Sequence, residues 1–358
     1  MRAHTGRSGS AGTRRRLMVA LVAVASVAAL ALGGAAAGGP TRSTRPVAAL
    51  GSITIGGVFC TCHTDVYVAW KKGFLAKHGV EVKNYVLTQG GSATIAGVAG
   101  GTFDFGPTTL EAVVRSQASS VPLKAVANLY PEFWSLLVRN DQRSTIRKIS
   151  DLKGKTVGVS LIGSGSWAFL VGMLGKAGIN ASDVNIVQLG GLTNILTALK
   201  AKKVDASIAW EPGTSAAARG GIATPIVNLQ IPGVVGKVFG SNVSMSQVLA
   251  VRADRVSSDP ALVKAVVAAI KDADTWLIAN KKHPVAVANV LKSVAPGTIS
   301  TGTLLAAVKA ALKVQPKTPL LTRQGYQTST SLLVQTGALK QPVPFDQVVD
   351  CRFAGCGP

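Results

Sequence analysis

Four cysteines and one histidine are the residues best suited to metal or redox chemistry in this sequence. Cys60, Cys62 and His63 lie close together, whereas Cys351 and Cys356 lie near the end of the chain. Thiolates and imidazoles bind zinc, but the single residue between Cys60 and Cys62 is one fewer than in common zinc motifs. A metal- or thiol-dependent enzyme that uses Cys60, Cys62 and His63 therefore stays open as an alternative.

The same four cysteines could instead form disulfides, for which four cysteines allow three pairings. A bond between Cys60 and Cys62 would strain the geometry of so short a loop. We therefore expect cross-bonds that join Cys60 or Cys62 to Cys351 or Cys356. Such bonds would attach the C-terminal tail to the first loop.

Three turns rich in Gly and Ser each follow an expected strand and open an expected helix. They lie at 90–92, 163–166 and 190–192. The N-terminus of a helix offers unpaired N–H groups and the positive end of the helix dipole, which suit an anion. Small residues also let a ligand approach the backbone closely. All three turns lie at the carboxyl ends of strands, where open α/β sheets bind their ligands.

Aromatic and acidic side chains follow other strands. Trp210 could pack against a ligand and Glu211 could accept a hydrogen bond from it, and Tyr130 and Trp134 are similar candidates. The sequence shows no nucleophile–base pair, and its four histidines are too scattered for a metal cluster. We therefore predict a binding protein that needs no metal and no cofactor, not an enzyme.

Strands and helices alternate along the chain with short Gly-rich turns, which is typical of a parallel sheet. The order restarts at 156, and the stretch around Asp104 resembles the stretch around Asp205. This weak repeat predicts two similar α/β lobes. We also expect both aspartates to cap neighbouring backbone groups. The expected strands are 52–59, 80–87, 101–106, 123–129, 156–160, 184–189 and 206–210.

The N-terminal segment has the pattern of an export signal. Three arginines at 14–16 precede a 16-residue apolar stretch at 17–32 and then small residues up to 37. This pattern predicts a signal peptide over 1–37, loosely similar to a twin-arginine signal, followed by a linker over 38–50. An uncleaved membrane anchor is the alternative. Either way, we expect the protein to work in the periplasm or elsewhere outside the cytoplasm.

The chain is strongly basic, with 38 Lys and Arg against 16 Asp and Glu among 358 residues, a net charge of +22. Seven of the arginines lie in the first 49 residues, and without them 31 basic and 16 acidic residues leave +15. No long basic run and no nucleic-acid motif accompanies this charge, so we expect no nucleic-acid partner. A hydrophobic fraction of 47% excludes global disorder.

Several ordered stretches together resemble the periplasmic solute-binding proteins of ABC importers, in the group for nitrate, sulfonate, taurine and thiamine-pyrimidine precursors. The resemblance covers about residues 52–350. The matching stretches are 66–82, 99–106, 151–159, 163–166, 198–206, 210–212 and 344–350.

This resemblance implies the type II-like periplasmic-binding-protein fold, in which two α/β lobes close on a small ligand. Lobe 1 would comprise 51–139 and 246–358, and lobe 2 would comprise 140–245. The loop at 59–63 departs from the small, Pro-containing loop of the family, so the resemblance does not imply the ligand's identity. The implied ligand-binding residues are Cys62, His63, Gly91, Ser92, Thr108, Thr109, Ser164, Gly165, Ser166, Trp167, Gly191, Trp210 and Glu211.

Together, these observations predict a monomeric solute-binding protein that delivers a small solute to an ABC permease in the membrane. The basic charge and the helix N-termini favour an anion, such as a sulfonate, nitrate or taurine. A pyrimidine precursor stacked on tryptophan is an alternative, as is a sensor that presents its ligand to a receptor.

Overall fold

The structure is a computed structural model that describes residues 49–117, 121–335 and 339–358. The predicted signal peptide at 1–37 and residues 38–48 of the predicted linker lie outside this part of the chain. None of the described helices is long and apolar enough to cross a membrane.

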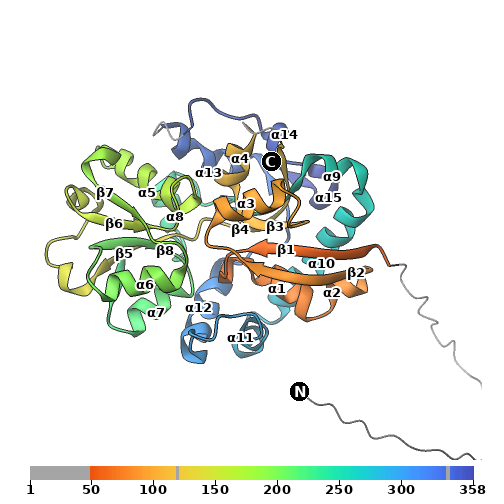
Figure 1. Ribbon diagram of the computed structural model, residues 1–358, viewed down its shortest axis with the longest axis horizontal. Coiled ribbons are helices and arrows are strands. Elements are labelled where there is room, and N and C mark those ends of the chain that lie inside the picture. The colour runs from red at the N-terminus through yellow and green to blue at the C-terminus, as the bar shows by residue number, and fades with distance from the viewer. Residues whose placement is uncertain (1–48, 118–120, 336–338) are drawn as a thin grey trace, which may run out of the picture. The chain divides into compact units, whose positions relative to one another are not determined.

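Lobe 1 is built on five strands in the order β2-β1-β3-β10-β4 (Figure 1). A single bridge between Ile55 and Phe105 joins the β1–β2 pair to the other three strands. β10 runs antiparallel to both of its neighbours. The bounds of these strands are β1 Gly51–Gly57, β2 Val80–Leu87, β3 Gly106–Thr109, β4 Leu123–Tyr130 and β10 Gln247–Arg252.

Lobe 2 repeats this order as β7-β6-β8-β5-β9, again with one antiparallel strand, β5, in the fourth place. The prediction placed residues 135–139 in lobe 1, but β5 pairs with β8 and β9. Its buried apolar residues suit the centre of either sheet, so only the pairing shows to which lobe they belong. The bounds are β5 Ser135–Arg139, β6 Thr156–Val159, β7 Asn185–Gln188, β8 Ala206–Ala209 and β9 Ala223–Asn228.

Each lobe thus receives its antiparallel strand from the chain as it crosses over from the other lobe. The first crossing lies between β4 and β5, and the second lies between helix α8 (Val234–Phe239) and β10. The two-lobed α/β fold expected from the sequence is confirmed.

Helices cover both sheets, and α13 contacts α4 of lobe 1 as well as α5 of lobe 2. α12 contacts α11 and also α7 of lobe 2. Helices of lobe 1 are α1 Thr64–Lys71, α2 Phe74–Lys77, α3 Gly91–Ala99, α4 Leu110–Ser116, α9 Ala253–Ser258, α10 Pro260–Ala279, α11 Pro284–Lys292, α12 Thr301–Val314, α13 Arg323–Gln335, α14 Phe345–Val348 and α15 Cys351–Ala354. Lobe 2 has α5 Gly165–Lys176, α6 Leu192–Lys200, α7 Gly213–Arg219 and α8.

Local sequence explains where the longest helix begins. Asp259 accepts a hydrogen bond from the backbone N–H of Leu262 at 3.2 Å, and Pro260 occupies the first helical position. Proline suits this position because its missing N–H would have no partner there. Apolar residues then recur along one face of α10 and pack into the core of lobe 1.

The internal repeat is visible in the hydrogen bonds of two aspartates. Asp104 accepts a hydrogen bond from the N–H of Thr54 at 2.7 Å, and Asp205 accepts one from the N–H of Thr156 at 3.0 Å. The aspartate therefore ties β3 to β1 in lobe 1 and β8 to β6 in lobe 2. The expected capping role is confirmed for both residues.

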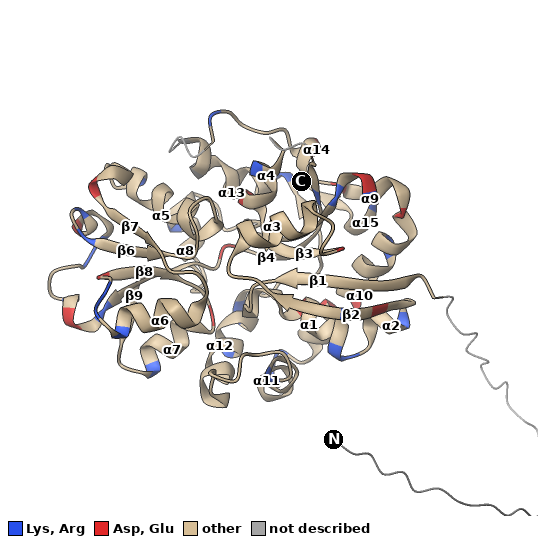
Figure 2. Cartoon of the chain, in the orientation of Figure 1, with Lys and Arg blue, Asp and Glu red and all other residues tan. Residues whose placement is uncertain are grey.

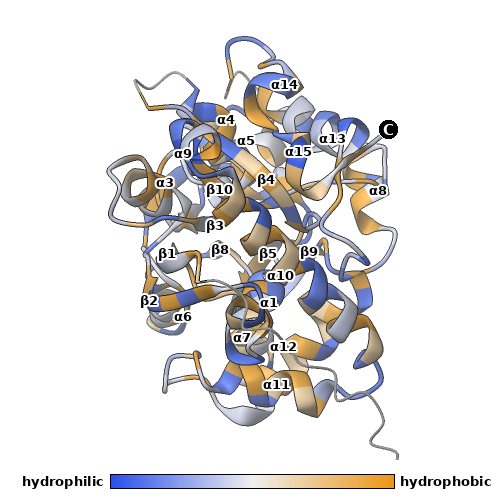
Figure 3. Cartoon of the chain, turned by 90° about the vertical axis from the view of Figure 1, so that its right-hand side faces the viewer, coloured by the Kyte–Doolittle hydropathy of each residue, from blue (hydrophilic) through white to orange (hydrophobic). Residues whose placement is uncertain are grey.

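Figure 2 shows Lys, Arg, Asp and Glu positions along elements of both lobes, and Figure 3 shows hydrophobic and hydrophilic positions alternating within the helices. Three buried apolar clusters form the cores, two in lobe 1 and one centred on lobe 2. Lys and Arg positions lie on elements of both lobes in Figure 2.

The predicted cross-bonds between the two cysteine pairs are wrong. Cys60 is bonded to Cys62, and Cys351 to Cys356. The chain turns into a 3-10 helix at Thr61–His63, so the Cα atoms of Cys60 and Cys62 are only 5.0 Å apart, within the usual range for disulfides. The two pairs also lie in different places, since Cys60 and Cys62 join the core of lobe 2 whereas Cys351 packs against a core of lobe 1.

Candidate functional site

Two adjoining cavities lie between the lobes and share Val58 and Trp210 in their walls. The larger cavity has a volume of about 450 Å³ and the smaller one of about 20 Å³. Residues of the larger wall include Phe59, Leu87, Gln89, Gly191, Leu192, Asn194, Leu196, Pro212 and Ile299. The wall of the smaller one includes Gly90, Gly91, Thr94, Thr108, Thr109, Phe133, Trp134, Ser160, Ser164, Gly165 and Gln247.

The first turns of two helices, one from each lobe, border the small cavity. α3 begins at Gly91 and α5 begins at Gly165. A Cβ atom on Gly165 would lie 2.5 Å from Cγ2 of Thr109 and 2.8 Å from Cζ2 of Trp134. Glycine at this position therefore lets lobe 2 approach lobe 1 closely at the cleft.

Three serines of lobe 2 form a compact hydroxyl cluster beside the small cavity. The hydroxyls of Ser160, Ser164 and Ser166 lie 2.8 to 2.9 Å from one another. Ser166 also accepts a hydrogen bond from the N–H of Ser160 at 3.0 Å, and it is fully buried behind the wall. Ser166 thus positions the two serines that border the cavity.

Several contacts hold the two lobes together around the cleft. Oε1 of Gln89 in lobe 1 accepts a hydrogen bond from the N–H of Gly191 in lobe 2 at 3.0 Å. Nε1 of Trp210 donates to the carbonyl oxygen of Phe59 at 3.0 Å. The Arg115 guanidinium lies 5.3 Å from the centre of the Trp167 ring. The lobes therefore meet in a closed arrangement.

Glu211 does not border either cavity. Its two carboxylate oxygens accept hydrogen bonds from the backbone N–H and the hydroxyl of Ser215, both at 2.9 Å. Burial raises the pKa of the Glu211 carboxyl above its usual range. Its backbone oxygen accepts a hydrogen bond from the N–H of Thr61 at 3.2 Å. Glu211 therefore fixes the first turn of α7 and the contact between the lobes.

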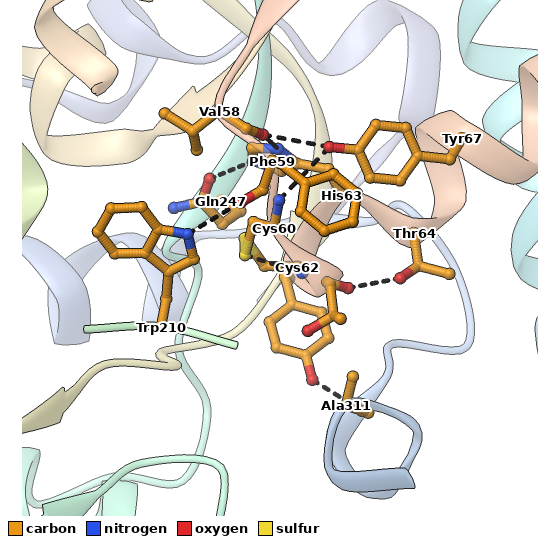
Figure 4. Close-up of a disulfide and its surroundings, with 12 residues drawn as sticks. Val58, Phe59, Cys60, Cys62, His63, Thr64, Tyr67, Trp210, Gln247 and Ala311 are labelled. Atoms are coloured by element: carbon orange, nitrogen blue, oxygen red, sulfur yellow. Dashed lines mark hydrogen bonds between the residues drawn. A yellow bond between two sulfur atoms is a disulfide. The ribbon is translucent and has the colours of Figure 1, made fainter. Parts of the chain in front are cut away.

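Phe59 of the loop at 59–63 lines the larger cavity, whereas residues 60–63 line neither cavity; Figure 4 shows the surroundings of this loop. His63 is fully buried, with Nδ1 at 3.1 Å from the Val58 oxygen and Nε2 at 2.6 Å from Oε1 of Gln247. Cys62 donates its N–H to the sulfur of Cys60 at 3.0 Å. No group of three metal-binding side chains occurs in the described part of the chain.

The structure brings seven of the thirteen predicted ligand-binding residues to the cavity walls. The six others, including Cys62 and His63, do not line either cavity. The seven are Gly91, Thr108, Thr109, Ser164, Gly165, Gly191 and Trp210, and the six are Cys62, His63, Ser92, Ser166, Trp167 and Glu211.

Sequence reasoning missed several polar residues of the walls. Gln89 directly precedes the Gly90-Gly91 turn, and Ser160 directly follows β6, so strand ends could have indicated both. Gln247 gave no such signal, since it begins an antiparallel strand that comes from much later in the chain. Among the residues lining the two cavities, no Lys, Arg, His, Asp or Glu is present.

The sequence model of the family described as "NMT1/THI5 like" matches residues 60–284, more than half of the chain. The chain belongs to this family. One relative is a protein of Brucella abortus (strain 2308) that is named as a binding protein. It is 26% identical to this chain over 227 residues, which are 61% of this chain and 64% of the relative. The riboflavin-binding protein RibY of Chloroflexus aurantiacus is 25% identical over 210 residues, 57% of this chain and 55% of RibY. The chain thus spans less than two thirds of either relative.

Solved structures share the fold. The alkanesulfonate-binding protein SsuA from Xanthomonas axonopodis pv. citri, bound to MOPS, has a TM-score of 0.67 and 20% sequence identity. The similarity covers 84% of this chain and 98% of SsuA. The fold of this family member is therefore that of the periplasmic binding proteins.

Proposed function

We propose that this protein is the extracytoplasmic solute-binding component of an ABC importer, which captures a small solute by lobe closure and delivers it to the permease. The observation that carries the proposal is the pair of adjoining cavities between two lobes of matching topology. A ligand that contacts both lobes stabilises the closed state, and the closed state is the form that a permease could recognise.

The two cavities suggest a solute with a small polar head and a larger, partly apolar body. The smaller cavity has hydroxyls and two helix N-termini around it, which suit a head that accepts hydrogen bonds. The larger cavity combines apolar side chains with the amides of Gln89 and Asn194. The smaller cavity has room for about one water-sized group, so an organic sulfonate would place its body in the larger cavity and direct one oxygen of its head into the smaller one.

A neutral heteroaromatic solute, such as a pyrimidine, is the second candidate. No cationic side chain lines either cavity, so an anion would have only backbone and hydroxyl donors to balance its charge. Trp210 borders both cavities and lies edge to face with Trp134, which borders the smaller one. These rings offer flat surfaces to an aromatic solute.

An enzyme that uses the thiols of the 59–63 loop has less support. Cys60 and Cys62 are bonded to each other, and no free cysteine occurs among the described residues. Thiol counting and metal analysis of the exported protein test this alternative. Free thiols with stoichiometric metal would favour the enzyme, and two disulfides without metal would favour the binding protein.

A thermal-shift screen of the full chain tests the proposed function. A ligand that binds only the folded state raises the melting temperature, and the rise grows with the logarithm of the ligand concentration above its Kd. The panel comprises alkanesulfonates, taurine, nitrate and pyrimidines, and we expect at least one of them to stabilise the protein. The Leu196→Glu variant, which places a charge in the wall of the larger cavity, should lose the shift. No shift with any solute would contradict the proposal.

A further inference from the structure

The buried ring of His63 lies between two hydrogen-bonding neighbours, and its protonation state fixes which of them must donate a hydrogen. Its Nδ1 faces the carbonyl oxygen of Val58 at 3.1 Å, and its Nε2 faces the side-chain amide of Gln247 at 2.6 Å. A neutral imidazole has one N–H and one lone pair, so it donates one hydrogen bond and accepts the other. Only a protonated ring could donate to two oxygens.

A protonated ring does not suit this environment. Burial lowers the pKa of His63 to about 4, and the two hydrogen bonds do not offset this effect. No carboxylate forms an ion pair with the ring among the described residues. The Asp65 carboxyl, two residues along the chain, is itself buried, and burial together with the nearby Asp274 raises its pKa well above the usual value. At neutral pH the ring of His63 is therefore uncharged.

The carbonyl oxygen of Val58 determines which ring nitrogen of His63 carries the hydrogen. The Val58 oxygen can only accept, and it also accepts the hydroxyl hydrogen of Tyr67 at 3.1 Å. Nδ1 of His63 must therefore be the donor, and Nε2 must accept. The neighbour of Nε2 is a glutamine amide, whose oxygen and NH₂ group exchange places by a 180° rotation. The hydrogen bonds thus require the NH₂ group of Gln247 to face His63.

We propose that Gln247 donates its NH₂ group to His63, turns its carbonyl oxygen toward the cleft and thereby selects solutes that carry an N–H or O–H donor. The inference rests on the proposed function and refines its substrate class. Gln247 is itself part of the small cavity's wall, and Figure 4 shows its amide between His63 and Trp210. The outer atom of this amide forms no hydrogen bond within the described chain, which leaves it available to a solute.

This orientation separates the two candidate solutes. A sulfonate offers only acceptors, so it would face the carbonyl oxygen of Gln247 without a hydrogen bond. An amino or hydroxyl group on a heteroaromatic ring would donate to that oxygen, and its ring nitrogens could accept from the N–H groups and hydroxyls nearby. A buried acceptor left without a donor weakens binding strongly, which makes Gln247 a specificity-determining residue.

The first test needs no ligand. In the full chain labelled with ¹⁵N-histidine, NMR identifies which ring nitrogen carries hydrogen. His63 gives the resonances that persist when His4, His78 and His283 are all replaced by Gln. We expect the Nδ1–H tautomer, unchanged between pH 5.5 and pH 8. An Nε2–H tautomer or a doubly protonated ring at pH 7 would overturn the proposed orientation.

The second test uses two probes that differ only in a donor group, 4-aminopyrimidine and 4-methylpyrimidine, in calorimetric titrations at pH 8. We expect the amino compound to bind at least about tenfold more tightly. Gln247→Met should abolish this preference, because it keeps the length of the side chain and removes the amide. Gln347→Met, the same exchange on the exposed surface of α14, should keep it.

The outcomes of the probe experiment distinguish this inference from the proposed function. Equal affinities, or a preference that survives Gln247→Met, would overturn the role of Gln247. Binding of propanesulfonate but of neither pyrimidine would overturn it as well, while the proposed function would stand. If no solute of the screening panel bound, the proposed function would fail, and the tautomer of His63 would still decide the orientation of Gln247.

Discussion

The two lobes share one strand order but differ in the loops that they bring to the cleft. In lobe 1 the loop after β1 carries a disulfide and a buried histidine, whereas in lobe 2 the loop after β6 carries the Ser160, Ser164 and Ser166 cluster. The repeated topology places both loops at the same point of their sheets. The residue types then determine the chemistry: the loop of lobe 1 places a buried imidazole against Gln247 of the cleft wall, and the loop of lobe 2 brings a cluster of hydroxyls to it.

We expect the largest change in unfolding free energy from a substitution in the segment between β4 and β5, where the chain first crosses between the lobes. Glu132 lies on this segment, and burial raises the pKa of its carboxyl to about 7 from 4.5. The folded protein therefore holds a proton that the unfolded chain releases above about pH 4.5. The stability that this proton contributes is present in full below that pH and is lost as the pH rises through about 7.

Glu132→Gln removes this dependence and should stabilise the protein at pH 8 by up to about 3 kcal/mol. Urea unfolding at pH 4 and pH 8 measures the effect, which should be small at pH 4. Glu81→Gln on the exposed part of β2 is the matched control and should change little at either pH. A Glu132→Gln variant no more stable than the wild type at pH 8 would contradict this account of the crossing.

Asp104 and Asp205, at equivalent positions of the two lobes, test whether the same hydrogen bond contributes equally to the stability of each lobe. Asp104→Ala and Asp205→Ala each remove a charge-assisted hydrogen bond to a backbone N–H, at 2.7 Å and 3.0 Å. We expect each variant to lose about 2 kcal/mol of unfolding free energy. Asp346→Ala, at an exposed aspartate of α14, should lose much less. A large difference between Asp104→Ala and Asp205→Ala would show that the repeat is not energetically equivalent.

Close approach of the lobes depends on Gly165. In Gly165→Ala the added methyl group would collide with Thr109 of lobe 1 and also with Trp134, so closure should be hindered. We expect affinity for the best solute of the screening panel to fall about tenfold, equivalent to about 1.4 kcal/mol. Gly297→Ala is the control, since a Cβ there meets no atom within 4 Å. Equal affinity in both variants would show that closure at Gly165 does not limit binding.

We expect the smallest change in stability from a substitution at another pair of equivalent positions in the two lobes. Gly101 precedes β3 and Lys202 precedes β8, and both have a positive φ, 75° at Gly101 and 59° at Lys202. The left-handed conformation costs a lysine roughly 1 kcal/mol that a glycine avoids. Lys202→Gly should therefore stabilise lobe 2 by up to about 1 kcal/mol, reduced by the lost ion pair with Asp141. Thermal unfolding measures the change, and a clear destabilisation would argue against strain at Lys202.

The sequence predicted the repeat, the two lobes and seven of the residues that line the cavities, because strand ends and Gly/Ser turns are local patterns. It did not predict the pairing of β5, whose buried residues suit either sheet. Cys60 and Cys62 were misassigned because the 3-10 turn that brings them together leaves no mark in their spacing. Gln247 escaped notice because its place in the cleft depends on β10 crossing back to lobe 1.

Closure of the two lobes on a solute is the central claim, and small-angle X-ray scattering tests it most directly. The full chain is measured alone and with each solute of the sulfonate and pyrimidine panel at saturating concentration. We predict that at least one solute reduces the radius of gyration, and that the same solute does not do so in Leu196→Glu. A radius of gyration unchanged by every solute of both classes would contradict the claim.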